Sequence, residues 1–256
     1  SIPDLFHLSH DVAKNSALAI FRRLRHAQQA LTHARERLAT VQTAHPGSAQ
    51  TQQAQAVVES HEAEVKRWQG VRSAYRTQLA TLSLTLHPWR LVDLTRQSSQ
   101  EVEHRLQAAV TALETVIATQ GLPTKKTTLD KVRKQLAGVS ALVDLWWQTV
   151  GRDVEQLALS PRWHQWVEEL MLPLMYWQEQ LSRTRCLSQK AQIAQALQTI
   201  QEAFERHPCT GRLGPEVLAD WKAWAADHAK AFQRASSAVE GRNGYLSQMQ
   251  HNHRGL

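Results

Sequence analysis

Hydrophobic residues recur along most of this chain every three or four positions, which is the spacing of one face of an α-helix. Two long stretches show this pattern first, at about residues 9–44 and 49–84. In the first stretch Leu24, Leu31 and Leu38 also recur every seven residues, as in helices that pack along one another. The second stretch is predicted to bury one stripe of side chains: Ala54, Val57, His61, Trp68, Val71, Tyr75 and Leu82.

The four residues between these stretches predict a helical hairpin. They are His45, Pro46, Gly47 and Ser48, and they interrupt a helix because proline lacks the backbone donor and glycine permits a chain reversal. Two long helices with so short a connection are expected to fold back on each other as an antiparallel pair. At ~1.5 Å per residue this pair would be ~50 Å long.

Shorter helices are predicted for the rest of the chain, and together they favour a helical bundle. They cover about residues 98–120, 129–159 and 188–207, with further helices that start at Ser160, Gly214 and Ser236. Thr128 and Ser160 stand where N-caps are expected. Spacing predicts the buried faces of the first two of these helices: Val102, Leu106, Ala109, Val110, Leu113 and Ile117, and Leu136, Val139, Val143, Trp146 and Val150.

The composition agrees with an all-α fold. The chain has only 10 Gly and 8 Pro among 256 residues, and both residue types usually interrupt regular structure. Alternating runs typical of strands are hard to find. We therefore expect an N-terminal segment with the long hairpin at residues 1–90, a helical bundle at residues 91–230 and a C-terminal helix at residues 231–256.

The chain has nine tryptophans, and two interpretations of them are open. Trp163, Trp166, Trp177, Trp221 and Trp224 could be stacking platforms for unpaired bases. Their helical spacing on apolar faces favours the other interpretation, in which most of them are core or interface anchors.

The charge of the chain favours an anionic partner. The formal net charge is +7 and the isoelectric point is about 9.7. Nucleic acid is the commonest anionic partner of a soluble protein, although many basic proteins bind no nucleic acid specifically. Two basic clusters stand out: Arg22, Arg23, Arg25, Arg35 and Arg37, and Lys125, Lys126, Lys131, Arg133 and Lys134. Either cluster could follow DNA phosphates or be a solvated helix face.

The cysteines, the apolar stretches and the N-terminus together predict the cellular compartment. Cys186 and Cys209 are the only cysteines, and they form no CxxC motif, so a reducing compartment is expected. No apolar stretch is long enough to predict a membrane span, and the N-terminus has no signal-peptide pattern. We expect a cytoplasmic protein, and the absence of an initiator Met is what a fragment would show.

The two ends of the chain resemble the DDE transposases of bacterial insertion sequences. In that family the second catalytic Asp commonly reads Asp-x-Phe-His, and here Asp4 is followed by Leu5, Phe6 and His7. The third carboxylate commonly lies in Ser-x-x-Val-Glu-Gly-x-Asn, which matches SSAVEGRN around Glu240. The resemblance is most specific over residues 232–256, weaker over the first ten residues, and only architectural between them.

The resemblance implies the C-terminal portion of an enzyme with an RNase H-like core and a large helical insertion, with most of the sheet absent. Asp4 and Glu240 would be catalytic and would hold Mg²⁺ for two-metal phosphoryl transfer. Because they are 236 positions apart, the chain between them would have to form a closed helical lobe. Double-stranded DNA would be the partner, bound in the bacterial nucleoid, and a homo-oligomer would form through the hairpin. The implied DNA contacts are Arg234, Arg242, Asn243, His253 and Arg254.

Several competing interpretations stay open. Asp4 could be an exposed acid before the first helix, and Ser237 with Glu240 fits a capping box. A capping box leaves Gly241 and Gly244 unexplained, because each costs ~1 kcal/mol inside a helix. The run Gly-Arg-Asn-Gly also fits a turn or the GXXG loop of KH domains, although the strands of that fold are missing. The alternative function is a non-enzymatic helical module for oligomerisation or DNA binding.

One departure from the family concerns activity. The first catalytic Asp of the family lies on a central strand upstream of the second, and no strand-rich segment precedes Asp4 here. We therefore expect that the chain as given neither cleaves nor joins DNA.

Overall fold

The computed structural model describes residues 5–124 and 126–232, and the side chains of residues 16–124 and 129–232. Within these ranges every regular element is a helix, and Trp89 and Arg96 form the single isolated β-bridge. The long helices are α1 (Leu5–Ala44), α2 (Ala49–Thr85), α3 (Ser99–Thr119), α4 (Lys126–Gln156) and α7 (Leu187–Arg206). The shorter ones are α5 (Pro161–Trp166), the π-helix η1 (Val167–Met171), α6 (Leu172–Arg183) and the 3₁₀-helix η2 (Thr210–Arg212). Residues 215–232 are also helical, so the all-α prediction is confirmed.

The described residues form two compact units. Unit 1 comprises Leu5, residues 83–107 and residues 134–232. Unit 2 comprises residues 6–82 and the described part of residues 108–133. The boundaries fall inside α3 and α4 and close to the outer ends of α1 and α2, so each of these four helices contributes residues to both units.

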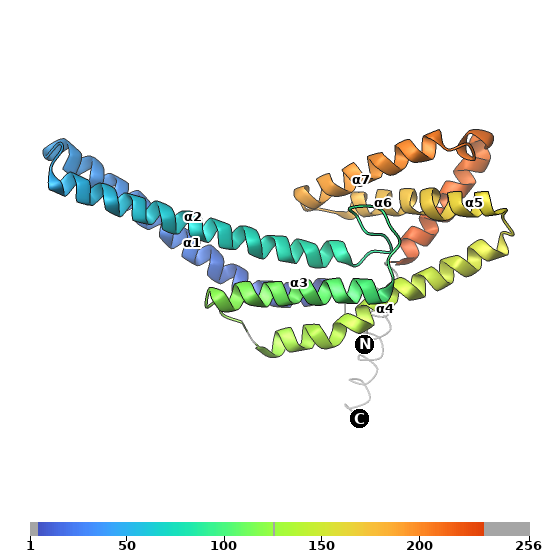
Figure 1. Cartoon of the computed structure of the whole chain (residues 1–256), viewed down its shortest axis with the longest axis horizontal. Helices are drawn as coiled ribbons and strands as arrows, with labels where there is room; N and C mark the ends of the chain where they lie inside the picture. Colours follow the sequence, from blue (N-terminus) through green and yellow to red (C-terminus); the bar gives the residue numbers. More distant parts are fainter. Residues whose placement is uncertain (1–4, 125, 233–256) are drawn as a thin grey trace, which may run out of the picture. The chain divides into compact units, whose positions relative to one another are not determined.

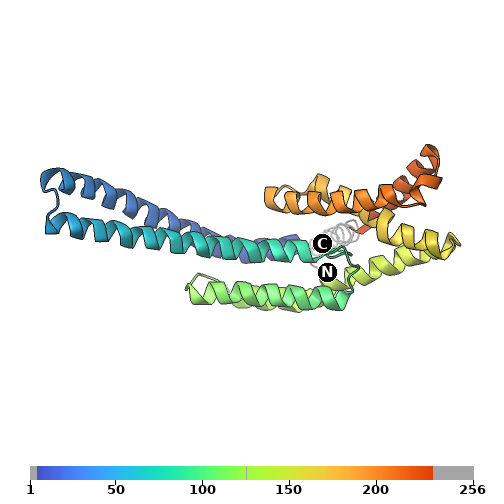
Figure 2. The same cartoon turned by 45° about the horizontal axis from the view of Figure 1, so that its top comes forward.

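In unit 2, α1 and α2 form the antiparallel pair that the sequence predicts (Figures 1 and 2). Gly47 makes the reversal between them, with φ of +74°, a value that residues with a Cβ rarely adopt. The Ser48 hydroxyl accepts a hydrogen bond from the Thr51 backbone N–H at 3.2 Å, which caps the start of α2. The Thr51 hydroxyl in turn donates to the His45 carbonyl at 2.7 Å. Local polar contacts therefore hold a turn that proline and glycine begin.

Of the seven side chains predicted for the buried stripe of α2, Trp68, Tyr75 and Leu82 are buried, Ala54, His61 and Val71 are half-buried, and Val57 is exposed. Val58 is 4% exposed, whereas Val57, which the spacing placed in the stripe, is 44% exposed. Val65, seven residues after Val58, is also buried, so Val58 takes the buried place that the spacing gave to Val57. The other buried hydrophobic residues of the pair are Ile20, Leu24, Ala27, Ala34, Trp68, Tyr75 and Leu82.

The predicted faces of α3 and α4 are confirmed at every position named. Helix α4 begins at Lys126, two residues before Thr128, so the prediction that Thr128 caps this helix is wrong. Ser160 does occupy the N-cap position of α5, but its carbonyl, not its hydroxyl, accepts the hydrogen bonds of Trp163 and His164, both at 2.9 Å.

A single helix was predicted from Ser160 onward, and a π-helical turn interrupts it at Val167–Met171. Pro173 lies two positions after Met171, the last residue of this turn. Proline cannot donate to the carbonyl four residues before it, and its ring collides with that carbonyl in a regular helix. The wider π turn moves this carbonyl away from the proline ring, and the Leu172 N–H donates to the Val167 carbonyl five residues back.

The tryptophans form the core of unit 1, as their helical spacing favoured. Of the nine in the chain, only Trp68 lies in unit 2. Six of the nine are buried and the other three are half-buried. Trp89 lies 4.9 Å from Trp147 and 5.3 Å from both Trp146 and Tyr176, measured between ring centroids. Such tilted and edge-to-face pairs stabilise a core beyond the area that they bury.

Candidate nucleic-acid interface

All the site residues that the resemblance predicts lie outside the described residues. These are Asp4, Glu240, Arg234, Arg242, Asn243, His253 and Arg254. Along the sequence, the described residues nearest to Asp4 and Glu240 are Leu5 and Phe232, and both belong to unit 1. In the sequence these neighbours are 227 positions apart.

The described side chains contain no group of three or more His, Cys, Asp or Glu residues that could hold a metal ion. Nor is any described helix long and apolar enough to cross a membrane.

The basic cluster on α1 is only partly available to a partner. Arg23 donates to the carbonyls of Gln120 at 2.7 Å and Gly121 at 3.1 Å, and its guanidinium lies 5.1 Å from the Trp68 ring. Arg35 forms an ion pair of 2.6 Å with Glu62. Arg22, Arg25 and Arg37 are exposed. Unit 2 thus uses some of these arginines to stabilise its own packing and leaves others on its surface.

The second predicted cluster is divided in the same way. Arg133 forms an ion pair with Glu114, while Lys131 and Lys134 are exposed. The side chains of Lys125 and Lys126 lie outside the described ones.

A more organised basic site lies in unit 1, in the connection between α2 and α3 (Figure 1). Trp89, only 2% exposed, anchors the start of this loop in the aromatic core. The Arg90 N–H donates to the Thr95 carbonyl at 2.8 Å and the Leu94 N–H donates to the Arg90 carbonyl at 2.8 Å. These bonds close a tight loop between Trp89 and Arg96.

Side chains within the loop fix its shape further. Asp93 accepts hydrogen bonds from the Thr95 N–H at 3.2 Å and the Thr95 hydroxyl at 2.7 Å, and Arg90 Nε donates to it at 2.8 Å. These contacts and the guanidinium charge hold the pKa of the Asp93 carboxyl well below its usual range. Leu94 adopts φ of 60°, and Val92 is 90% exposed. The loop is therefore a shaped structure with an exposed tip.

The base of the loop is pinned by buried polar groups. Gln97 is 3% exposed, and its amide donates to the His87 carbonyl at 2.9 Å. His87 Nδ1 shares a hydrogen bond of 2.5 Å with the Tyr176 hydroxyl. Burial lowers the pKa of His87 to about 4 and raises that of Tyr176, so both groups are neutral at neutral pH.

Beside this loop lies a cavity of about 170 Å³. Its charged lining residues are Arg90, Arg96, Arg105 and Glu101, joined by His104 and by the polar side chains of Thr95 and Gln97. The cavity is much larger than the ~10–15 Å³ that one water molecule requires. It therefore offers a space with several guanidinium donors on its wall.

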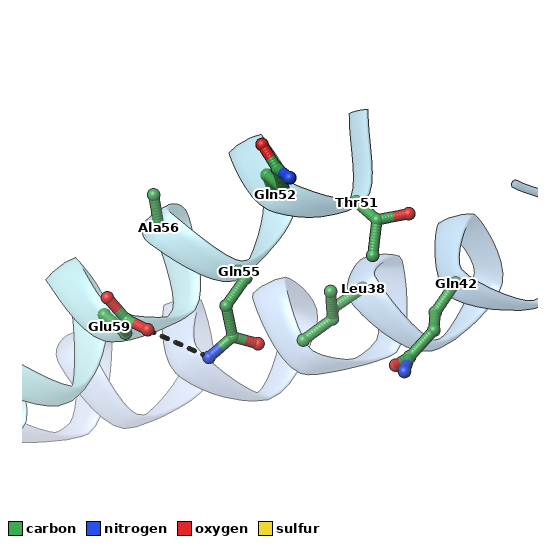
Figure 3. Close-up of a pocket in the computed structure, with 7 residues that line it drawn as sticks. All are labelled: Leu38, Gln42, Thr51, Gln52, Gln55, Ala56 and Glu59. Carbon is green, nitrogen blue, oxygen red and sulfur yellow. Dashed lines mark hydrogen bonds between the residues drawn. The ribbon is translucent and has the colours of Figure 1, made fainter. Parts of the chain in front are cut away.

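A second hollow, of about 330 Å³, lies between α1 and α2 near their connection. Figure 3 shows its lining, which includes Leu38 and Ala56 as apolar groups and the amides of Gln42, Gln52 and Gln55. Gln55 donates to Glu59 at 3.1 Å (Figure 3). This lining carries no excess positive charge, and it gives no reason to expect an anion there.

The sequence did not single out Arg90, Arg96 or Arg105. A signal was present, because His87, Pro88 and Trp89 mark a break between two helices and arginines follow at once. Periodicity carries no information inside a loop, so the grouping of these arginines could be recognised only once the fold was known.

A family of unknown function (DUF6399) matches residues 167–256. The match begins at η1, directly after α5, and spans the rest of the C-terminal bundle and the segment that contains Glu240. No curated protein and no solved structure matches the chain.

Proposed function

We propose that this chain is a portion of a DDE-type DNA transposase. In this proposal its helical lobe binds the double-stranded DNA of the transposon ends, and Asp4 and Glu240 supply two of the three carboxylates for two-metal phosphoryl transfer with Mg²⁺. The enzyme would act in the bacterial cytoplasm, at the nucleoid. The first catalytic Asp would come from a core that this chain does not contain.

The observation that carries the proposal is that residues from both ends of the described chain belong to unit 1. The resemblance requires two acids from opposite ends of the sequence to approach one metal site. Leu5 and Phe232, the described residues nearest to those acids, fall in the same compact unit although 227 positions separate them. The residues between them include residues 6–82 of the hairpin, which belong to unit 2, and this is the arrangement expected of a helical insertion.

The charge supports DNA as the partner. The net charge of +7 attracts a polyanion, and exposed arginines are available on both units. Contacts to phosphates release counterions, so the observed binding constant should fall steeply as salt increases.

The test is fluorescence anisotropy of the full chain with labelled duplex DNA over a range of salt concentrations. We expect salt-dependent binding that Arg242→Ala weakens more than Arg152→Ala does. Arg152 is a suitable control because it is exposed and its replacement removes the same charge. Equal losses in the two variants would mean general attraction between a basic protein and DNA, and would contradict the assignment of the C-terminal segment. Failure of the wild-type chain to bind duplex DNA would overturn the proposal.

A second candidate function is oligomerisation through the hairpin, with or without DNA. It is favoured by large hydrophobic side chains on the surface of α1 and α2: Leu18, Phe21 and Val57, which are 48%, 54% and 44% exposed. A monomeric mass for the full chain in light scattering, at concentrations where DNA binding saturates, would remove this candidate.

A further inference from the structure

We infer that the cavity beside residues 89–96 is a binding site for a phosphate group. The site is referred to below as the arginine pocket, and its working residues are Arg90, Arg96 and Arg105. The inference rests on the proposed function only in naming DNA as the source of the phosphate.

Each of the three arginines is held by a different neighbour. Arg90 is paired with Asp93. The guanidinium of Arg96 lies over the Trp147 ring, 3.9 Å from its centroid. Arg105 donates a hydrogen bond to the side-chain oxygen of Gln97, which is itself buried and bonded to the backbone. Such anchors reduce the entropy that a flexible side chain loses when it binds a ligand.

The anchors leave positive charge uncompensated. Among the described residues no carboxylate lies within ion-pair distance of Arg96 or Arg105. Glu101 lines the same cavity, but its carboxylate accepts hydrogen bonds from the Ser98 N–H at 2.8 Å and the Ser98 hydroxyl at 2.9 Å. That capping box turns Glu101 towards the start of α3. The pocket therefore has guanidinium donors in excess of its own acceptors.

The closeness of Arg105 to Arg90 also favours an anion in the pocket. Burial and the nearby positive charge of Arg90 lower the pKa of Arg105 by more than the charges of Asp93 and Glu101 raise it, so its charged form is less stable there than in water. An anion in the cavity would offset both effects by stabilising the charged form of Arg105.

Phosphate fits this site better than a carboxylate does. A guanidinium binds phosphate oxygens through two parallel N–H bonds, and each guanidinium has five donors, only some of which the anchors use. Three guanidiniums around one cavity can reach several oxygens of a tetrahedral group, whereas a carboxylate has only two. The polar groups of Thr95 and His104 on the same wall could bind a remaining oxygen.

The inference is tested with single substitutions in the full chain. Arg96→Gln removes an exposed side chain, and Arg96→Lys keeps the charge but loses the planar fork. Arg105→Gln is read together with its circular dichroism melt, because Arg105 is half-buried. Arg212→Gln is the matched control, since Arg212 is exposed in η2 of the same unit and lies outside the cavity.

Two ligands separate the possible sources of the phosphate. Duplex DNA is followed by anisotropy, and inorganic phosphate by titration calorimetry. With DNA, we expect Arg96→Gln to weaken binding about tenfold and to reduce the slope of log K against log salt by ~0.9. Arg96→Lys should recover only part of the affinity, and Arg212→Gln should change neither quantity.

The outcomes are distinct. If Arg96→Gln abolishes binding of inorganic phosphate but leaves DNA binding unchanged, the pocket takes free phosphate and DNA is excluded as the source. If wild-type chain binds no DNA, the proposed function fails, and the calorimetry alone decides the pocket. The inference is overturned if neither ligand responds to Arg96→Gln or to a folded Arg105→Gln, or if only an acidic peptide such as polyglutamate does.

Discussion

His87 makes the stability of unit 1 depend on pH, and the size of the effect follows from its surroundings. Its imidazole is hydrogen-bonded to Tyr176 and lies 4.9 Å from the Trp177 ring, between centroids. Burial lowers the pKa of His87 from 6.5 to about 4. In the unfolded chain the same group takes up a proton near its ordinary pKa.

The sign follows from proton binding. Between pH 6.5 and about 4 the unfolded state binds this proton and the folded state does not, so falling pH favours unfolding. Each unit of pKa difference corresponds to ~1.4 kcal/mol, so the full difference corresponds to ~3 kcal/mol. The free energy of unfolding should therefore be unaffected by this group above pH 6.5, fall as pH decreases, and level off below about pH 4.

The assay is urea unfolding followed by circular dichroism for wild type and for His87→Gln. Other groups also titrate in this range, so the quantity of interest is the difference between the two proteins. We expect wild type to lose ~3 kcal/mol more than the variant between neutral pH and pH 4. His26→Gln, at an exposed position of α1, is the control for the loss of a histidine elsewhere in the chain. Identical pH dependence of wild type and His87→Gln would refute the reasoning.

Two further predictions concern the hairpin and catalysis. Val58→Ala should lower the free energy of unfolding by ~1.5 kcal/mol, because it removes two buried methyl groups. Val57→Ala, at its exposed neighbour, should stay within ~0.5 kcal/mol of wild type. Urea unfolding of both variants measures the difference, and equal effects would contradict the burial of Val58 in preference to Val57. Under the proposed function the first catalytic Asp is not among residues 1–256, so the chain alone should not nick supercoiled plasmid with Mg²⁺ or Mn²⁺. Turnover that Glu240→Gln abolishes would contradict this.

Much of the fold could be predicted from spacing alone. The faces of α3 and α4 were correct because a helix of ordinary length keeps its 3.6-residue period in register with its core. In α2 the spacing selected Val57, whereas its neighbour Val58 is the buried residue; adjacent valines fit a spacing of three or four residues equally well, and only tertiary packing decides between them. The π turn before Pro173 arises where the helix continues past a proline, and the spacing of hydrophobic residues does not predict such a turn.

The arginine pocket could not be predicted for a different reason. Its arginines are fixed by contacts with Trp147 and Gln97, and Trp147 lies 51 positions from Arg96 in the sequence. Only tertiary packing brings these groups together. The two carboxylates, by contrast, were predicted from short motifs, and those motifs carry no information about the distance between Asp4 and Glu240.

That distance tests the account most directly. Spin labels can be placed at Asp4→Cys and Glu240→Cys after Cys186 and Cys209, the only native cysteines, are replaced by Ser and Ala. Carboxylates that share two metal ions ~3.5–4 Å apart must have neighbouring backbones, so the account predicts strong dipolar broadening and one short distance, which duplex DNA sharpens. A long distance in the DNA-bound chain would contradict the shared metal site and, with it, the transposase assignment.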